Sequence, residues 1–252
     1  MTSSTADIGK ILAARPRIHR TAEGQSMDMS LASDVLDFIM ENIPPDASTL
    51  ETGCGLSTVL FASRSAHHVV ITPAREEFET VLRFCAENNI ETDALDFREG
   101  ASELILPSLD VKPLDLVLID GRHGFPAPFI DWFYTAGKLK IGGLMIVDDC
   151  WLWTGKVLSD LLSEQPQWEQ VRDFDGRTSA FRKLDERSEW GDWTDQPYVY
   201  RNGYVKLKDG TTVVELPQPP QPATTTAMER VAGHLKRGEL GVLAKKAMGR
   251  LR

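Results

Sequence analysis

Short apolar runs alternate with amphipathic segments along most of the chain. The runs contain few polar interruptions, which predicts strands buried on both faces. Helices on either side of a sheet bury strands in this way, so the pattern predicts an α/β fold with a mainly parallel sheet. The predicted strands are STLET (48–52), HVVIT (68–72), LDFRE (95–99), LDLVLID (114–120) and GLMIVDD (143–149).

The segments between these runs place apolar residues at helical spacing. A helix over 30–43 ends at the prolines 44–45, because proline cannot continue it. Two later runs, 169–175 and 178–184, are separated by Gly176 and predict an antiparallel hairpin at one edge of the sheet. Further helices are predicted within 57–65, 75–89, 101–109 and 127–140.

The ends of the chain differ in character from its centre. Residues 1–29 form a polar N-terminal arm. The stretch 185–216 contains KDGT (208–211), which favours a hairpin turn because glycine tolerates positive φ. It predicts an accessory β element whose aromatic residues either line a substrate pocket or pack on the domain. These aromatics are Trp190, Trp193, Tyr198, Tyr200 and Tyr204.

Beyond this element, residues 217–227 (PQPPQPATTTA) have the composition of an extended linker. The tail 228–252 carries seven Lys or Arg residues and two Glu residues along a weak apolar face, which predicts a basic helix. Such a tail either makes peripheral contact with an anionic surface, a membrane or an acidic partner, or packs on its own acidic domain.

Composition narrows the choice of ligand and compartment. The chain of 252 residues has a formal net charge of −9, which argues against nucleic-acid binding and favours a small-molecule ligand. Cys54, Cys85 and Cys150 form no close pairs, so we expect reduced thiols in a cytoplasmic protein. We expect neither a secretory leader nor a membrane span, which needs about 20 apolar residues. The oligomeric state is left open, a homo-oligomer included.

A glycine turn follows the first strand, in LETGCGLSTVLFA (50–62). Ligands of open parallel sheets bind outside the carboxyl ends of the strands, where Gly53 and Gly55 let the backbone approach a ligand closely. Glu51 would repel a pyrophosphate and attract the ammonium group of an amino-acid-bearing cofactor. The turn therefore predicts a cradle for such a cofactor. Cys54, inside it, is either a nucleophile or a small residue that fills a tight turn.

At this point the chain resembles the class I S-adenosylmethionine-dependent methyltransferases, whose first motif is an acid, a residue, glycine, a residue and glycine. ETGCG (51–55) matches that motif, with Ser57 in place of a third glycine. The resemblance covers the domain predicted at 30–184. It implies a Rossmann-like, doubly wound, mainly parallel seven-stranded sheet with an antiparallel edge hairpin. It also implies S-adenosylmethionine bound by Glu51, Gly53, Gly55 and Ser57.

The resemblance extends to the adenosine side of the cofactor and has one departure. EGASELILPSL (99–109) looks like the segment that cups the adenine, with Gly100, Ala101 and Ser102 at the contact positions. The second strand would end in an acid that binds the ribose hydroxyls, but here it ends in Thr72. Thr72 offers one hydrogen bond, and the acids 76–77 follow a turn later.

Three carboxylates follow the fourth and fifth strands, which resemble those of small-molecule O-methyltransferases. Asp120, Asp148 and Asp149 would repel one another without a shared proton or cation, and their hard oxygens favour Mg²⁺. The resemblance implies a magnesium ion that lowers the pKa of a substrate hydroxyl. We expect Asp120 also to contact the cofactor and the reacting atoms. The alternative is that Asp149 caps the next helix and Asp120 orients the turn at Gly121.

His123 lies on the loop after the fourth strand, in IDGRHGF (119–125). It is either a general base for a hydroxyl proton or a residue that fixes the loop, and Asp131 either partners it or stays on a helix surface. The predicted function is methylation of a hydroxyl on a polar small molecule, a sugar or polyketide-like product. The alternative is a non-catalytic Rossmann-like binding or scaffold module in an envelope-associated assembly, which the missing acid at Thr72 favours.

Overall fold

The computed structural model describes residues 5–14, 19–20, 26–27, 30–44, 46–185, 192, 196–202, 204–206 and 213–215. The chain divides into two compact units, residues 1–190 and 191–252. Among the residues described, no helix combines the length and the hydrophobicity that crossing a membrane requires.

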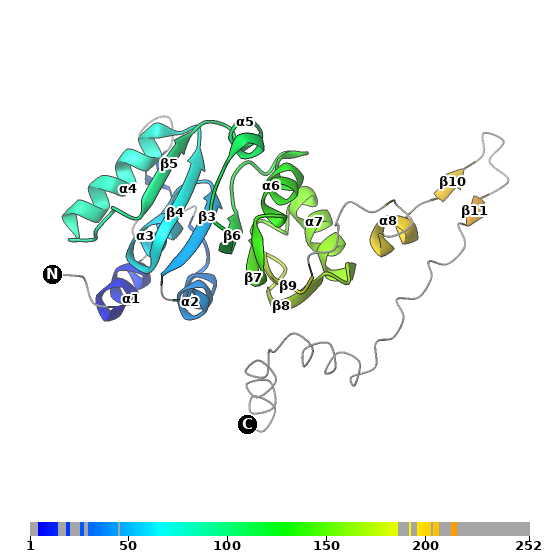
Figure 1. Cartoon of the computed structure of the whole chain (residues 1–252), viewed down its shortest axis with the longest axis horizontal. Coiled ribbons are helices and arrows are strands. Elements are labelled where there is room, and N and C mark those ends of the chain that lie inside the picture. The colour runs from blue at the N-terminus through cyan, green and yellow to red at the C-terminus, as the bar shows by residue number, and fades with distance from the viewer. Residues whose placement is uncertain are drawn as a thin grey trace, which may run out of the picture. The chain divides into compact units, whose positions relative to one another are not determined.

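The first unit is built on one seven-stranded sheet (Figure 1). Its strands are β3 (Ala47–Thr52), β4 (Ser65–Thr72), β5 (Leu95–Glu99), β6 (Leu114–Ile119), β7 (Leu139–Val147), β8 (Trp168–Phe174) and β9 (Thr178–Lys183). They lie in the order β5-β4-β3-β6-β7-β9-β8, and only β8 and β9 pair antiparallel to their neighbours. The predicted doubly wound sheet with an antiparallel edge hairpin is confirmed. The strand order reverses between β3 and β6.

Helices form two groups of mutually contacting elements. One group is α1 (Thr5–Ala13), α2 (Ser33–Asn42), α3 (Leu56–Arg64) and α4 (Arg75–Glu87). The other is α5 (Ser102–Ile105), the 3-10 helix η1 (Leu106–Ser108), α6 (Ala127–Ala136) and α7 (Trp153–Glu164). Helices on the two faces of one sheet form two separate groups of this kind. Each segment that was predicted to be helical contains one of these helices.

Helix α1 lies in the stretch that the sequence analysis took for a polar arm. Its Ile8 and Leu12 are 1% and 4% exposed and belong to the main hydrophobic cluster. They stand four positions apart, so they share one face of the helix. A pair this short is hard to distinguish from chance in a polar segment. The same stretch also contains the short antiparallel strands β1 (His19–Arg20) and β2 (Ser26–Met27).

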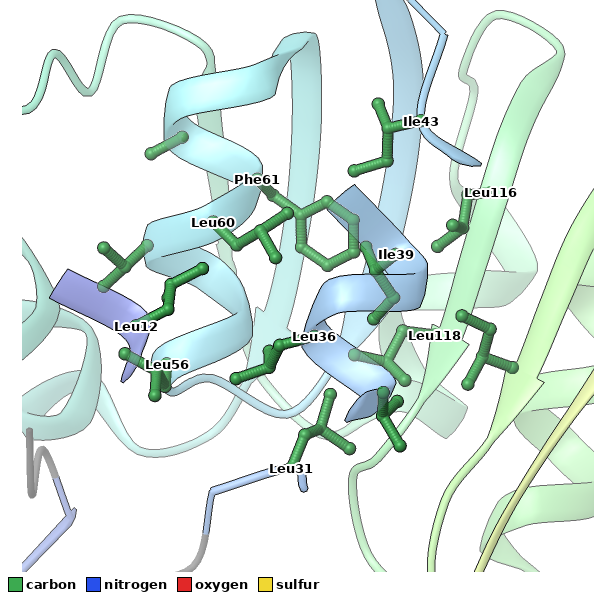
Figure 2. Close-up of a cluster of buried hydrophobic side chains, with 14 of the residues drawn as sticks. Leu12, Leu31, Leu36, Ile39, Ile43, Leu56, Leu60, Phe61, Leu116 and Leu118 are labelled. Atoms are coloured by element: carbon green, nitrogen blue, oxygen red, sulfur yellow. The ribbon is translucent and has the colours of Figure 1, made fainter. Parts of the chain in front are cut away.

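The core packs α2 and α3 on the centre of the sheet (Figure 2). Ile39 of α2 and Phe61 of α3 lie near Leu116 and Leu118 of β6, and all four belong to one buried cluster. Val117, between the two leucines, is fully buried, and the alternation of side chains along a strand directs it to the opposite face. Burial of both faces fixes the strands, and hence the loops at their carboxyl ends.

In the second unit the structure describes α8 (Pro197–Asn202) and the antiparallel strands β10 (Tyr204–Lys206) and β11 (Val213–Glu215). The two strands lie within the predicted accessory β element at 185–216. Its predicted KDGT turn, Trp190 and Trp193 lie outside the described residues, as do the predicted linker 217–227 and basic tail 228–252.

Candidate active site

A cavity of about 450 Å³ opens at the carboxyl ends of the parallel strands. Thr52 of β3, Thr72 of β4, Asp120 after β6 and Asp148 after β7 all line it. The cavity thus lies where the strand order reverses, which is the ligand-binding position of open α/β sheets. Its volume lies within the range of small-molecule pockets, about 300 to 1,000 Å³.

The glycine turn forms one wall of the cavity, where Gly53 and Gly55 are both lining residues. Gly53 has a φ of +97°, and a Cβ built on it would lie 2.3 Å from the backbone oxygen of Asp120. Glycine is therefore required by the approach of two backbones. A valine at this position would displace the turn after β6 before it met a ligand.

Glu51 lies beneath this turn and is not among the residues that line the cavity. Its side chain is 1% exposed. Ser57 Oγ donates to its Oε2 at 2.6 Å, Thr58 Oγ1 donates to its Oε1, and His68 Nε2 lies 3.1 Å from Oε1. Thr58 Oγ1 also accepts the backbone N–H of Gly55 at 2.9 Å. The carboxylate therefore holds the turn in place from below.

Sequence reasoning missed His68, which completes this buried cluster. Its Nδ1 lies 2.8 Å from Thr49 Oγ1, and its ring stacks on Phe61 with centroids 4.2 Å apart. The sequence did indicate a buried polar contact at His68, because a histidine inside the buried strand β4 needs a polar partner on a neighbouring strand.

The wall formed by β4 and α5 carries the predicted adenosine contacts. Ala101 and Ser102 line the cavity, whereas Gly100 lies behind them with a φ of +152° and donates its N–H to the backbone oxygen of Thr72 at 3.0 Å. Thr72 lines the cavity as well, and its Oγ1 accepts the N–H of Ala74 at 3.1 Å. Of the two acids that follow, Glu77 lines the cavity, while Glu76 is exposed and is not a lining residue.

The opposite wall gathers acids around the predicted base. One ligand atom each of Asp120, His123 and Asp149 lies within 4.8 Å of the others. His123 Nε2 is 3.0 Å from Asp149 Oδ2, and Trp151 Nε1 donates to Asp149 Oδ1 at 2.6 Å. Asp149 makes no side-chain cap of α7, whose N-cap residue is Leu152, so the capping alternative is wrong. Asp149 instead orients His123.

The third predicted carboxylate, Asp148, lies outside this group of three. Its side chain is 6% exposed, lines the cavity and accepts a hydrogen bond from Thr178 Oγ1. The donor set of Asp120, His123 and Asp149 has two carboxylates and one imidazole. The carboxylates suit Mg²⁺, and the imidazole also suits a first-row transition ion such as Mn²⁺. The residues therefore fit a divalent cation, with His123 in the place predicted for Asp148.

Burial and mutual repulsion change the protonation of the acids. Burial raises the pKa of Asp120 well above its usual range, the charge of Asp148 adds to this, and Arg177 opposes it. Burial also raises the pKa of Asp148, against the hydrogen bond from Thr178. Both carboxyls thus favour an accompanying proton or cation, as the clustering of acids in the sequence predicts.

Arg177 is a lining residue that sequence reasoning missed. It lies in the turn between β8 and β9, and its guanidinium donates to the backbone oxygen of Ser30 at 3.5 Å. Because β9 runs antiparallel to β7, the start of β9 lies at the carboxyl end of β7. The turn of the predicted edge hairpin therefore reaches the ligand edge of the sheet, which follows only once the pairing of β9 with β7 is known.

Two other candidates have structural roles. Burial and the charge of Glu51 raise the pKa of the Cys54 thiol, which therefore stays protonated and fills the turn rather than attacking a substrate. Asp131 is fully buried and accepts a hydrogen bond from Thr52 Oγ1 at 2.8 Å. It neither partners His123 nor lies on a helix surface, contrary to both expectations. It ties α6 to the end of β3.

Comparison with known proteins agrees with this geometry. Residues 50–150 match a family model described as "Methyltransferase domain". Residues 50–150 therefore resemble a methyltransferase domain. No curated protein matches the sequence.

Solved structures share the fold of this methyltransferase domain at low identity. The O-methyltransferase TomG of Streptomyces achromogenes, solved with SAM, is 16% identical, with 73% of this chain and 92% of that chain covered and a TM-score of 0.56. Cofactor-bound Rv0187 from MTB is 14% identical, with 72% and 91% covered and a TM-score of 0.55. The SAH-bound Podospora anserina methyltransferase PaMTH1 is 17% identical, with 71% and 87% covered and a TM-score of 0.50.

Proposed function

We propose that the methyltransferase domain transfers the methyl group of S-adenosylmethionine to a hydroxyl oxygen of a small molecule. The observation that carries this proposal is the pairing of two walls in one cavity. The glycine turn, Thr72 and Ala101 form a cradle on one side, and the His123–Asp149 pair lies on the other. The binding of SAM by TomG supports the choice of cofactor.

His123 is the proposed general base. When its Nε2–H donates to Asp149 Oδ2, its Nδ1 is the atom that accepts a proton, and the hydrogen bond from Trp151 holds Asp149 in position. The acceptor hydroxyl gives its proton to the imidazole while its oxygen bonds to the methyl carbon. The carbon–sulfur electron pair stays on sulfur, so S-adenosylhomocysteine leaves.

The acids beside His123 define a second role for the site. In this role, which excludes His123 as the base, Asp120 and Asp149 with His123 as the third donor would hold a divalent cation. Such an ion supplies a positive charge that binds a substrate hydroxyl and lowers its pKa. Without the ion, the same carboxylates accept hydrogen bonds from substrate hydroxyls. Turnover measured with EDTA and then with added Mg²⁺ or Mn²⁺ distinguishes the two modes.

Calorimetry of the full chain with S-adenosylmethionine tests the cofactor assignment. We expect saturable binding with one site per chain, and binding of S-adenosylhomocysteine as well. If neither S-adenosylmethionine nor S-adenosylhomocysteine binds, with or without Mg²⁺, the proposed enzymatic activity is rejected. A scaffold module that retains only the fold would then be favoured.

Methyl transfer from labelled S-adenosylmethionine to a panel of hydroxyl compounds tests the reaction. His123→Gln should lower kcat about 10²- to 10⁴-fold, the usual contribution of a general base, and leave the cofactor Kd unchanged. A variant with full kcat would show that His123 only fixes its loop.

A further inference from the structure

Three large aromatic side chains stand exposed on the segments that follow β6 and β7, and one of them, Trp151, lines the cavity. Phe125, Trp151 and Trp153 are 69%, 66% and 67% exposed, respectively. Soluble proteins bury most such rings, and neighbouring exposed ones mark surfaces that bind something. The Phe125 ring lies 6.1 Å from that of Trp153, between centroids. We refer to Phe125, Trp151 and Trp153 as the aromatic rim.

The aromatic rim is continuous with the reacting end of the cavity. Trp151 lines the cavity, and its indole N–H binds the same carboxylate of Asp149 that orients His123. Phe125 follows His123 by two residues on the loop after β6, and Trp153 begins α7. The three rings are therefore carried by the same two loops that carry the base and its orienting acid.

The rim is poorly suited to the cofactor. The wall proposed to bind adenosine consists of Thr72, Ala101 and Ser102, at the ends of β4 and β5. The rim residues instead follow β6 and β7. In the sheet order, β3 separates β4 and β5 from β6 and β7. The rim is thus on the side from which an acceptor would approach His123.

The chemistry of the rim also discriminates between acceptors. A free sugar presents hydroxyls around its ring and needs many hydrogen-bonding partners. The rim offers mainly ring faces and one indole N–H, that of Trp153, because the indole N–H of Trp151 is already bound to Asp149. Aromatic faces favour flat, polarisable ring systems, which stack on them in offset or edge-to-face geometry.

We infer that the acceptor is a hydroxylated fused-ring aromatic compound, whose ring system lies across the aromatic rim while one hydroxyl reaches His123. This inference rests on the proposed function, because it names the substrate class of the same site. The sugar-type acceptor is the alternative that the test below separates from it. The transfer step itself is unchanged.

The test uses the full chain saturated with S-adenosylhomocysteine and two probes, 2-naphthol and methyl α-glucoside, in calorimetry. We expect 2-naphthol to bind, and Trp153→Ala and Phe125→Ala each to weaken it about tenfold, the loss expected for removing one stacked ring. Phe133→Ala is the matched control, because it removes another exposed ring, 46% exposed, that lies on α6 and outside the aromatic rim. It should leave the 2-naphthol affinity unchanged.

Three outcomes would overturn the inference. The first is no binding of 2-naphthol, or tighter binding of methyl α-glucoside than of 2-naphthol. The second is equal 2-naphthol affinity in wild type and both rim variants. The third is a wild-type dimer in sedimentation that Trp153→Ala converts to a monomer, because the rim would then be an interface between copies. Binding of S-adenosylhomocysteine is measured first. If it does not bind, the proposed function is rejected. If it binds but the rim variants do not change the affinity for 2-naphthol, only the proposed class of acceptor is rejected.

Discussion

Among individual residues, Glu77 is the acid that we propose for binding the ribose hydroxyls of the cofactor. The strand β4 ends in Thr72, so no acid stands where the ribose hydroxyls of the proposed cofactor would be bound. Glu77, five residues later on α4, is the acid that lines this part of the cavity. Its neighbour Glu76 carries the same group and points elsewhere, which gives the chain a built-in control.

We predict that Glu77→Gln weakens S-adenosylmethionine binding by about tenfold or more, because a hydrogen bond to a charged group contributes about 1.5–3 kcal/mol. Glu76→Gln should leave the Kd unchanged. Calorimetry on the two variants checks the pair. Equal effects of both substitutions would mean that the ribose is bound by other groups, Thr72 first among them.

Asp131 gives a prediction for the pH dependence of stability. Its burial raises the pKa of the carboxyl in the folded protein, and the hydrogen bond from Thr52 only partly opposes this. Below about pH 4 the carboxyl is protonated in both folded and unfolded chains. As the pH rises, the unfolded chain ionises first, so this residue lowers stability increasingly up to the folded pKa.

Asp131→Asn removes that ionisation and keeps an acceptor for Thr52. The difference in unfolding free energy, variant minus wild type, should therefore become more positive between pH 4 and pH 7 in urea titrations. Asp37→Asn, at an exposed position of α2, should show no comparable trend. A difference that falls with pH would mean that the folded carboxylate is favoured rather than penalised.

The residues that sequence alone could place are those whose role is local. Gly53 and Gly55 form the turn because backbone geometry is encoded within a few positions, and all but two of the predicted cofactor contacts line the cavity. Glu51 and Gly100 are the exceptions, and both support lining residues from behind. Arg177 could not be placed without the register of β9, because its contacts depend on which strand lies beside it.

At the scale of elements, the end of α6 depends on one buried cation. Lys183 of β9 is 4% exposed, and its Nζ donates to the backbone oxygens of Ala136 and Leu139 at 2.8 and 2.9 Å. These carbonyls lie at the end of α6 and the start of β7, where helix carbonyls lack partners. The lysine therefore fastens the edge hairpin to the helix layer.

We predict that Lys183→Met lowers the unfolding free energy by about 1.5–3 kcal/mol, the loss expected when hydrogen bonds from a charged donor are removed. Lys140→Met is the control, because Lys140 is 45% exposed and pairs with Asp115 at the surface, an interaction worth about 0–1 kcal/mol. Urea denaturation of both variants checks the difference. A Lys183→Met protein as stable as Lys140→Met would show that water satisfies the two carbonyls.

Element prediction succeeded where burial gives a clear pattern. The parallel strands β4, β6 and β7 contain apolar runs with little alternation, which predict buried strands. The strand β3 is buried although mostly polar, and β5 alternates apolar and charged residues at the edge of the sheet. Helix α1 was not predicted, because only Ile8 and Leu12 of its residues mark the buried face, and tertiary packing on α2 and α3 supplies the remaining stability.

For the whole molecule, the cavity walls come from elements spread across the domain, so a ligand that binds them stabilises the folded state as a unit. At a concentration of one hundred times Kd, S-adenosylmethionine should raise the unfolding free energy by about 2.7 kcal/mol. For a domain of this size the midpoint of thermal unfolding should rise by about 5–10 °C. Calorimetric scans check this. An unchanged midpoint at saturation would mean that the ligand binds the unfolded chain equally well.

The contact between Arg177 and Ser30 joins residues 147 positions apart. The ribosome releases the chain from its N-terminus at about 5–20 residues per second, so the glycine turn emerges many seconds before the turn that carries Arg177. Throughout that interval the nascent domain lacks the antiparallel hairpin and one cavity wall. The complete cavity therefore forms only after the hairpin of β8 and β9 has been synthesised, and its ligand can stabilise the finished domain but cannot guide the early steps of its folding.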